Sequence, residues 1–140
     1  TRICIAGFAN SSIRGMASDL PKLPSETYNI VLYHRPSAFP RLFSTPADLI
    51  LTGHTHGGQI RLPVWGALWT NEDTGRRWQY GRYQQNVKDL IVSRGLGCKD
   101  ATPEVRFLCP PEVVVVDLIG TGGGPSVPPA GATSPSGGTP

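Results

Sequence analysis

Short apolar runs bounded by turn-forming residues recur along the first 52 residues of the chain. They span residues 2–8, 28–33 and 48–52, and all three are rich in β-branched side chains, which predicts β-strands. Their apolar positions do not alternate with polar ones. Strands of this kind are covered on both faces, as at the centre of a parallel α/β sheet.

The segments between these runs predict little helix. Residues 12–20 have the pattern of a short helix that begins at Ser11 or Ser12 and ends before Pro21 and Pro24. The next connection, residues 36–46, is rich in proline and has room for one or two helical turns at most.

The pattern changes after residue 56, where loops rich in Gly, Asn and Asp separate further apolar runs. These runs predict strands over residues 57–63, 77–83, 89–93 and 113–119. Within residues 77–83, Trp78 and Tyr80 alternate with polar or small residues, the period of a half-exposed strand. The fold class predicted is therefore α/β, and mostly β after residue 56.

The length of 140 residues allows one domain, which we place at residues 1–119. Residues 120–140 contain 7 Gly, 5 Pro and no charged side chain, which predicts a disordered tail. The longest aliphatic run, Val113–Val116, is far shorter than the ~20 residues of a membrane-spanning helix. The chain begins with neither Met nor a secretory signal, which indicates a processed product or a piece of a longer protein, and its localisation stays open.

Net charge and cysteine content narrow the classes of function that the sequence allows. The formal net charge is +3, and the modest basic excess over residues 61–106 permits an anionic substrate without indicating a nucleic-acid binder. Cys4, Cys98 and Cys109 are odd in number and form no CxxC pair, which argues against a disulfide framework and against a cysteine zinc site.

All three histidines follow predicted strands directly. His34 comes after residues 28–33, and His54 and His56 lie in a Gly-His-Thr-His-Gly-Gly stretch after residues 48–52. The carboxyl ends of strands are where open α/β sheets bind ligands, and imidazole is the commonest ligand for zinc-type and iron-type ions. A metal site is one interpretation, and a turn cap together with a polar loop is the other.

These residues resemble a known family. Residues 33–36, 47–51 and above all 53–63 are similar to the carboxyl half of calcineurin-like metallophosphoesterases, in the branch that includes bacterial membrane-associated phosphodiesterases. The similarity continues through residues 80–83, 93–97 and 106–112, so it covers nearly all of residues 1–119.

The resemblance implies the carboxyl-terminal half of a four-layer α-β-β-α sandwich with two divalent ions (Mn, Fe or Zn) ~3.5–4 Å apart that activate a water for attack on a phosphoester. It further implies that His34 and His54 bind one ion and His56 the other. The substrate it suggests is a phosphodiester, with a lipid phosphodiester as one candidate.

The family's aspartate and asparagine motifs, D-x-H, G-D-x-x-D and G-N-H-[DE], do not occur in this sequence. Neutral imidazoles offset none of the charge of two divalent ions, so bridging carboxylates are expected. Asp48 is no candidate, because six residues of extended strand place it ~20 Å from His54. We therefore expect the amino-terminal half of the same domain to be a partner, and the isolated chain to be inactive.

Two alternatives remain from the sequence. The first alternative is that the chain is a non-catalytic remnant that acts as a metal-binding or interaction module. Nucleic-acid binding through the aromatic and arginine residues of 76–83 is the weaker alternative, since packing of these rings on the sheet explains them as well. Trp65 and Trp69 are expected to pack beneath their loop rather than to line a substrate groove.

Overall fold

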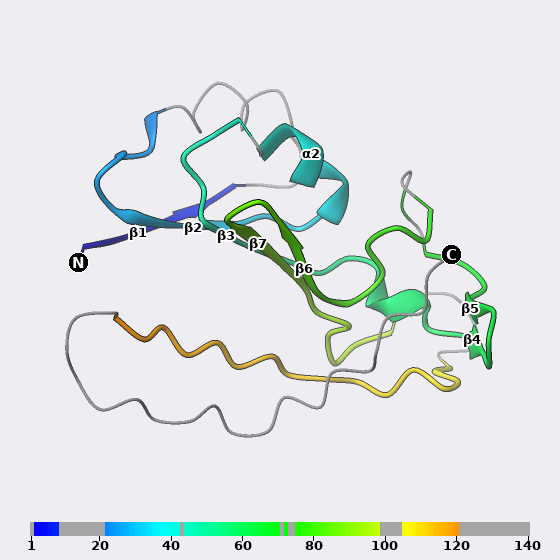
Figure 1. Cartoon of the computed structure of the whole chain (residues 1–140). Coiled ribbons are helices and arrows are strands. Elements are labelled where there is room, and N and C mark those ends of the chain that lie inside the picture. The colour runs from blue at the N-terminus through cyan, green and yellow to red at the C-terminus, as the bar shows by residue number, and fades with distance from the viewer. Residues whose placement is uncertain are drawn as a thin grey trace.

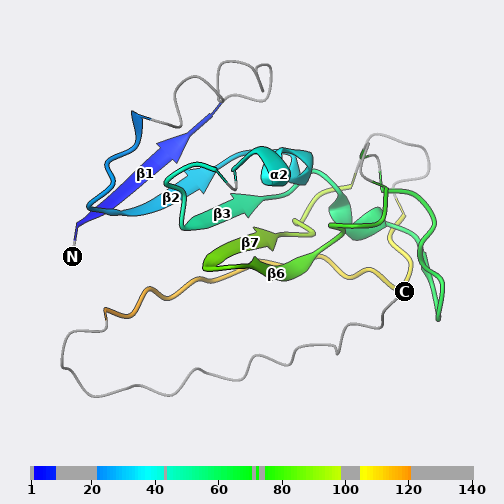
Figure 2. The same ribbon diagram turned by 45° about the horizontal axis from the view of Figure 1, so that its top comes forward.

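The computed structural model describes residues 2–8, 22–42, 44–70, 72, 75–98 and 105–120. Its main feature is a five-stranded sheet, seen edge-on in Figure 1 and tilted in Figure 2, with the strand order β1-β2-β3-β7-β6. The strands are β1 (Ile3–Gly7), β2 (Tyr28–Leu32), β3 (Leu49–Thr52), β7 (Lys88–Val92) and β6 (Gly81–Gln85). A separate two-stranded sheet pairs β4 (Arg61–Leu62) with β5 (Gly66–Ala67).

The main sheet is mixed. Strands β1, β2, β3 and β7 pair in parallel, and β6 pairs antiparallel with β7. The register aligns Val31 with Ile50 and Ile50 with Leu90, so these side chains form one row across the sheet. Because the strands are parallel, the ends of β2 and β3 that precede the histidine motifs lie at the same edge.

The hydrophobic core lies on one face of this sheet. The short helices η2 (Pro36–Ala38) and α2 (Phe39–Leu42) cover it, and Figure 1 shows α2 above the strands. Phe39 packs edge-to-face on Trp78, with ring centroids 5.5 Å apart. The core cluster consists of buried side chains from both layers: Val31, Tyr33, Ala38, Phe39, Leu42, Ala47, Ile50, Trp78, Leu90 and Val92.

The α/β class and most of the elements predicted from the sequence are confirmed. Strands predicted at residues 2–8, 28–33, 48–52 and 89–93 are present as β1, β2, β3 and β7, and residues 36–46 hold two short helical turns. The helix predicted at residues 12–20 and almost all of the tail predicted at 120–140 lie outside the described residues.

Three predicted strands are wrong in whole or in part. Residues 57–63 begin as the 3₁₀ turn η3 (His56–Gly58), and only Arg61–Leu62 pair as a strand. Residues 77–80 form a turn because Trp78 is drawn into the core, so β6 begins at Gly81. Within the described residues, 113–119 pair with no strand, and their aliphatic side chains are exposed.

The prediction that the first three strands are covered on both faces holds only in part. Side chains in β2 and β3 are largely buried, but Ile3 and Ile5 of the edge strand β1 are 52% and 65% exposed. Leu32 on β2 is also exposed. The described part of the chain thus leaves an apolar face, formed by Ile3, Ile5 and Leu32, opposite the core.

Candidate metal centre at the carboxyl ends of the strands

A pocket of about 500 Å³ opens at the carboxyl ends of β1, β2 and β3. It is lined by residues that end or directly follow these strands, among them Gly7, Phe8, Tyr33, His34, Thr52 and Gly53. Open α/β sheets bind their ligands at the carboxyl ends of the strands, and the sequence predicts the histidines at these same ends.

His34 and His54 meet beside this pocket. The Nε2 atom of His34 lies 2.9 Å from Nδ1 of His54, and the two rings stand edge-to-face with centroids 4.7 Å apart. A backbone hydrogen bond from Gly53 N–H to the His34 carbonyl, 3.1 Å long, ties the two motifs together. His34 and His54 are 20 positions apart in the sequence, and they lie together because each follows one of two neighbouring parallel strands.

Burial and the neighbouring His54 lower the pKa of His34, and Arg35 and His56 act in the same direction. The neutral imidazole is therefore favoured at neutral pH. That form carries the lone pair that a metal ion binds.

The loop that carries His54 and His56 has an unusual backbone. His54 and His56 have φ values of 69° and 49°, in the left-handed region that non-glycine residues rarely adopt. Thr55 supports this conformation, since its side-chain oxygen accepts from Gly57 N–H and its hydroxyl donates to the Gln79 carbonyl. Strained backbone of this kind persists where the surrounding structure fixes it, and it is common at functional sites.

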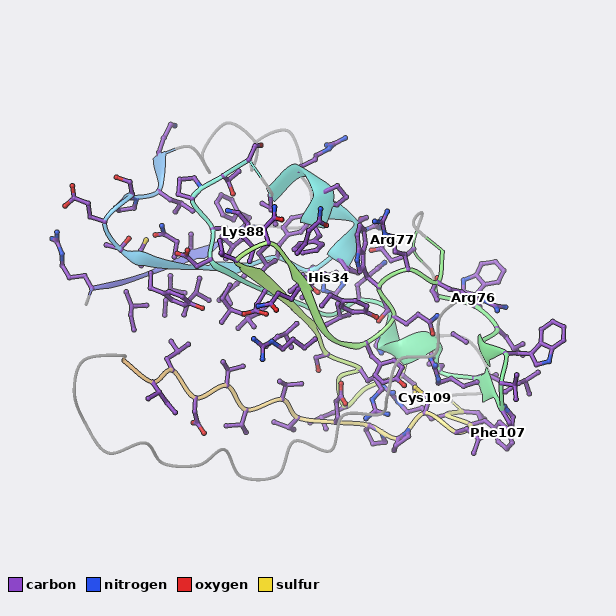
Figure 3. The ribbon with its side chains drawn as sticks, viewed as in Figure 1. His34, Arg76, Arg77, Lys88, Phe107 and Cys109 are labelled. Carbon is purple, nitrogen blue, oxygen red and sulfur yellow. The ribbon has the colours of Figure 1, made fainter. Side chains whose placement is uncertain are left out.

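The two glycines after His56 are required by close packing as well as by backbone angle. Gly57 and Gly58 have φ values of 63° and 86°. A Cβ on Gly58 would lie 2.3 Å from the Ala67 Cβ, and one on Gly57 would lie 2.7 Å from the Cys109 sulfur. The Gly-Gly pair therefore lets β5 and the segment around Cys109 approach the loop; Figure 3 labels Cys109 and His34.

His56 is oriented by different partners. Its Nδ1 lies 3.1 Å from the Gly97 carbonyl, which only accepts, and 3.5 Å from Arg106 Nη2, which only donates. The shorter contact favours the hydrogen on Nδ1 and the lone pair on Nε2. Arg106 donates to the carbonyls of His56 and Gly97 and so fixes this corner of the loop. The contacts that orient His56 are thus separate from those of the His34–His54 pair.

Two arginine side chains lie close to the loop, and Arg61 donates to the Gly57 carbonyl at 2.9 Å. The guanidinium groups of Arg61 and Arg94 lie 4.7 Å and 5.0 Å from the centroid of the Tyr80 ring. Arg94 also pairs with Glu112 at 2.6 Å, and that carboxylate raises the pKa of Arg94. Tyr80 thus lies against these two cations, and Trp78 is buried in the core.

The sequence did not predict that Glu72 lies beside His54. Its side chain is 0% exposed, and its Oε1 lies 3.9 Å from Nε2 of His54. Neither carboxylate oxygen has a hydrogen-bond partner in the structure. Nothing in the sequence signals this position, because Glu72 lies in a polar loop stretch with no motif spacing to the histidines.

Asp48 lies at the amino ends of the strands, opposite to the end that carries His54, as its spacing from His54 predicted. Its Oδ2 accepts from the Asn29 backbone N–H at 2.7 Å, near the amino ends of β2 and β3. The fully buried Asn29 side chain donates to the carbonyls of Pro24 and Pro46, which completes a structural network there.

The donor atoms at the carboxyl-terminal edge fit a divalent cation in kind. They are the ring nitrogens of His34, His54 and His56, and Glu72 places a buried carboxylate beside His54. In the ranges that the structure describes, no group of three or more His, Cys, Asp or Glu side chains is close enough to form a complete metal cluster. Cys4, Cys98 and Cys109 are free cysteines.

Imidazoles that follow the carboxyl ends of parallel strands in an α/β sheet are typical of proteins that bind a ligand at those ends. Comparison with known proteins identifies the class. The chain is 38% identical over 102 residues to the uncharacterized metallophosphoesterase YkuE of Bacillus subtilis, a match that covers 73% of this chain and 35% of that protein.

Two further relatives agree. The chain is 30% identical over 105 residues to the phosphodiesterase YaeI of Escherichia coli, covering 75% of this chain and 37% of YaeI. It is 32% identical over 108 residues to the UDP-2,3-diacylglucosamine pyrophosphatase LpxG of Chlamydia muridarum, covering 69% of this chain and 32% of LpxG. No protein-family model and no solved structure matches the chain.

The chain belongs to the metallophosphoesterase family, and its resemblance to the calcineurin-like members is confirmed. Members of this family use divalent metal ions and act on phosphoesters. The chain spans 32–37% of the length of these three relatives. Among the described residues, no helix combines the length and the apolar character needed to cross a membrane.

Proposed function

We propose that this chain forms part of a metal-dependent phosphodiesterase, in which His34, His54 and His56 are metal ligands. The observation that supports this most directly is the 2.9 Å approach of His34 Nε2 to His54 Nδ1 at the carboxyl ends of β2 and β3. Two imidazoles from separate strands, held with ring nitrogens facing each other, are arranged as ligands of one cation.

In this proposal each histidine has a distinct part. His34 and His54 hold one ion, and His56, whose Nδ1 faces the Gly97 carbonyl, offers Nε2 to a second. When bound, two divalent ions (Mn, Fe or Zn) supply an activated water and neutralise charge on the phosphoester. The lowered pKa of His34 favours the neutral imidazole at neutral pH, which is the form that binds a metal ion.

The charge of two such ions also requires carboxylates, which we propose come from an amino-terminal half that this chain does not contain. The D-x-H, G-D-x-x-D and G-N-H-[DE] motifs are absent from the sequence. On this basis residues 1–119 are a partial phosphoesterase domain, residues 120–140 are a tail, and the 140-residue chain by itself is inactive.

We propose a phosphodiester as the substrate, with a lipid phosphodiester as the first class to test. The names of two relatives support this choice. YaeI is called a phosphodiesterase, and LpxG is called a pyrophosphatase of a diacylated sugar nucleotide.

The test uses a full-length form that contains the upstream motifs. Replacing His54 or His56 by Ala is expected to abolish metal-dependent hydrolysis of a chromogenic phosphodiester while the circular dichroism spectrum stays unchanged. Gln84→Ala, an exposed change on β6, is the control and is expected to retain full turnover. Undiminished turnover in both histidine variants would refute the ligand assignment.

A second candidate is a non-catalytic module that binds metal or a partner. It is favoured by one observation, that the described residues contain no complete cluster of three metal-ligating groups. Sequencing upstream of Thr1 separates the two. In-frame aspartate and asparagine motifs support the enzyme, whereas a stop codon or a start codon directly before Thr1 supports the module.

A further inference from the structure

The carboxylate of Glu72 is the least explained group in the described structure. Its side chain is fully buried, and both of its oxygens lack a hydrogen-bond partner. Taking a carboxylate out of water without compensation is costly, so buried carboxylates are as a rule paired or coordinated. A buried, unpartnered carboxylate therefore indicates a nearby group that it serves.

The only charged or ionisable partner that lies within ion-pair distance of Glu72, among the described residues, is His54 at 3.9 Å. The contact is made to Nε2 of His54, whereas Nδ1 of the same ring faces His34. His54 thus stands between two groups, with one nitrogen toward the proposed metal position and the other toward the carboxylate.

This arrangement matches the chemistry of metal-bound histidines. A ligating imidazole generally presents its second nitrogen, as N–H, to a carboxylate or a carbonyl, which fixes the tautomer and the ring orientation and makes the ligand more basic. We propose that Glu72 is the positioning residue for His54, holding its ring from behind so that Nδ1 is directed to the ion. The inference rests on the proposed function, because it assumes that His54 is a ligand.

Backbone contacts keep Glu72 in place. The Gly75 N–H donates to the Glu72 carbonyl at 3.0 Å, and the buried Thr70 hydroxyl donates to the Gly75 carbonyl at 2.6 Å. These two bonds link Thr70, Glu72 and Gly75 to one another. The 3.9 Å separation from His54 is longer than a hydrogen bond, so in this structure the carboxylate lies beside the ring without a hydrogen bond to it.

The test titrates a full-length form that contains the upstream motifs with Co²⁺, whose visible absorption bands report both affinity and the ligand set. Glu72→Gln keeps the shape of the side chain and removes its charge. We expect it to weaken Co²⁺ binding about 10–100-fold without changing the shape of the bands, because the atoms bound to the ion stay the same. Glu26→Gln, an exposed carboxylate away from the site, is the matched control and should bind like the parent chain.

Stability of the metal-free chain supplies the second measurement. Removing an unpaired buried charge is expected to leave the urea midpoint of Glu72→Gln unchanged or higher, while Co²⁺ binding is weakened. A merely structural glutamate would instead lower the midpoint. A lower midpoint, unchanged Co²⁺ affinity or altered band shape would each overturn the positioning role.

His54→Ala separates this inference from the proposed function. If His54→Ala loses Co²⁺ binding and Glu72→Gln does not, the ligand assignment stands and the role of Glu72 fails. If neither variant alters Co²⁺ binding, or if the parent chain shows no saturable binding, the histidine site itself fails and the inference fails with it.

Discussion

Gly58 shows how closely the histidine loop is packed at the scale of a single residue. Its φ of 86° excludes an unstrained side chain, and an added Cβ would lie 2.3 Å from the Ala67 Cβ and 2.8 Å from the Trp69 carbonyl oxygen. Both neighbours belong to the segment around β5, so the loop and the small sheet must move apart to admit a methyl group.

We expect Gly58→Ala to lower the free energy of unfolding by ~1–3 kcal/mol more than Gly75→Ala does. Gly75 is the matched control, because it also has a positive φ of 61° but nothing lies within 4 Å of its added Cβ. The control therefore measures backbone strain alone. Urea denaturation of both variants decides the point, and equal losses would contradict the packing argument.

Tyr28, at the start of β2, gives the fold a dependence on alkaline pH. Burial raises the pKa of its phenol, and the nearby carboxylates of Asp48 and Asp89 raise it further. A phenol whose pKa is higher in the folded chain keeps its proton longer there than in the unfolded chain. Its contribution to stability is thus fully present below about pH 10 and is lost as the pH rises above that value.

Tyr28→Phe removes this titrating group. Its stability, measured by urea denaturation at increasing pH, is expected to fall less steeply above about pH 10 than that of the parent chain. Tyr80→Phe serves as the comparison. A slope for Tyr28→Phe equal to or steeper than the parent's would show that Tyr28 does not carry the effect.

At the scale of elements, the β4–β5 hairpin differs from its expected packing. Trp65 and Trp69 were predicted to lie beneath their loop, but they are 71% and 74% exposed, whereas Trp78 is 5% exposed. The packing prediction is wrong because β4 and β5 are only two residues each and pair as a separate sheet. A hairpin this short has no interior in which to bury two indoles.

Fluorescence quenching tests this difference. Acrylamide is expected to quench most of the tryptophan emission of the chain, and Trp65→Phe combined with Trp69→Phe to leave a component from Trp78 that is quenched several-fold less. Trp78→Phe is the converse control and is expected to retain the accessible component. Equal quenching of all three indoles would contradict the exposure of the hairpin.

The same scale shows which elements the sequence can predict. Strands β2 and β3 and the meeting of His34 with His54 follow from local pattern, because parallel strands share one edge for their carboxyl ends. The start of β6 does not, since Trp78 packs on Phe39, a contact formed only in the folded chain. Glu72 was missed for the same reason, as a loop carries no spacing that predicts where its carboxylate will lie.

At the scale of the whole molecule, one face of the sheet is unlike the other. The core and α2 cover one face, whereas the other carries Ile3, Ile5 and Leu32 with substantial exposure. Residues 113–119 are a further exposed apolar segment, strand-like in sequence but unpaired within the described chain. Their β propensity could not reveal this, because a strand forms only where it has a partner.

Exposed apolar surface of this kind favours association. Ile5 is 65% exposed on the edge strand β1. The outer backbone groups of β1 pair with no other described strand. Ile5 therefore belongs both to the exposed apolar face and to an unpaired sheet edge. We expect Ile5→Lys to reduce self-association of the 140-residue chain, measured by sedimentation velocity, with little change in its urea midpoint. The lysine interrupts the apolar surface and places a charge beside the unpaired edge.

Gln84→Lys separates the two causes. It adds the same charge on the exposed side of β6, at the other edge of the sheet, and removes no apolar side chain. If association depends on the face formed by Ile3, Ile5 and Leu32, Gln84→Lys associates like the parent and only Ile5→Lys is more monomeric. Equal reduction in both variants would assign the effect to net charge, and this face would then have no part in holding copies of the chain together.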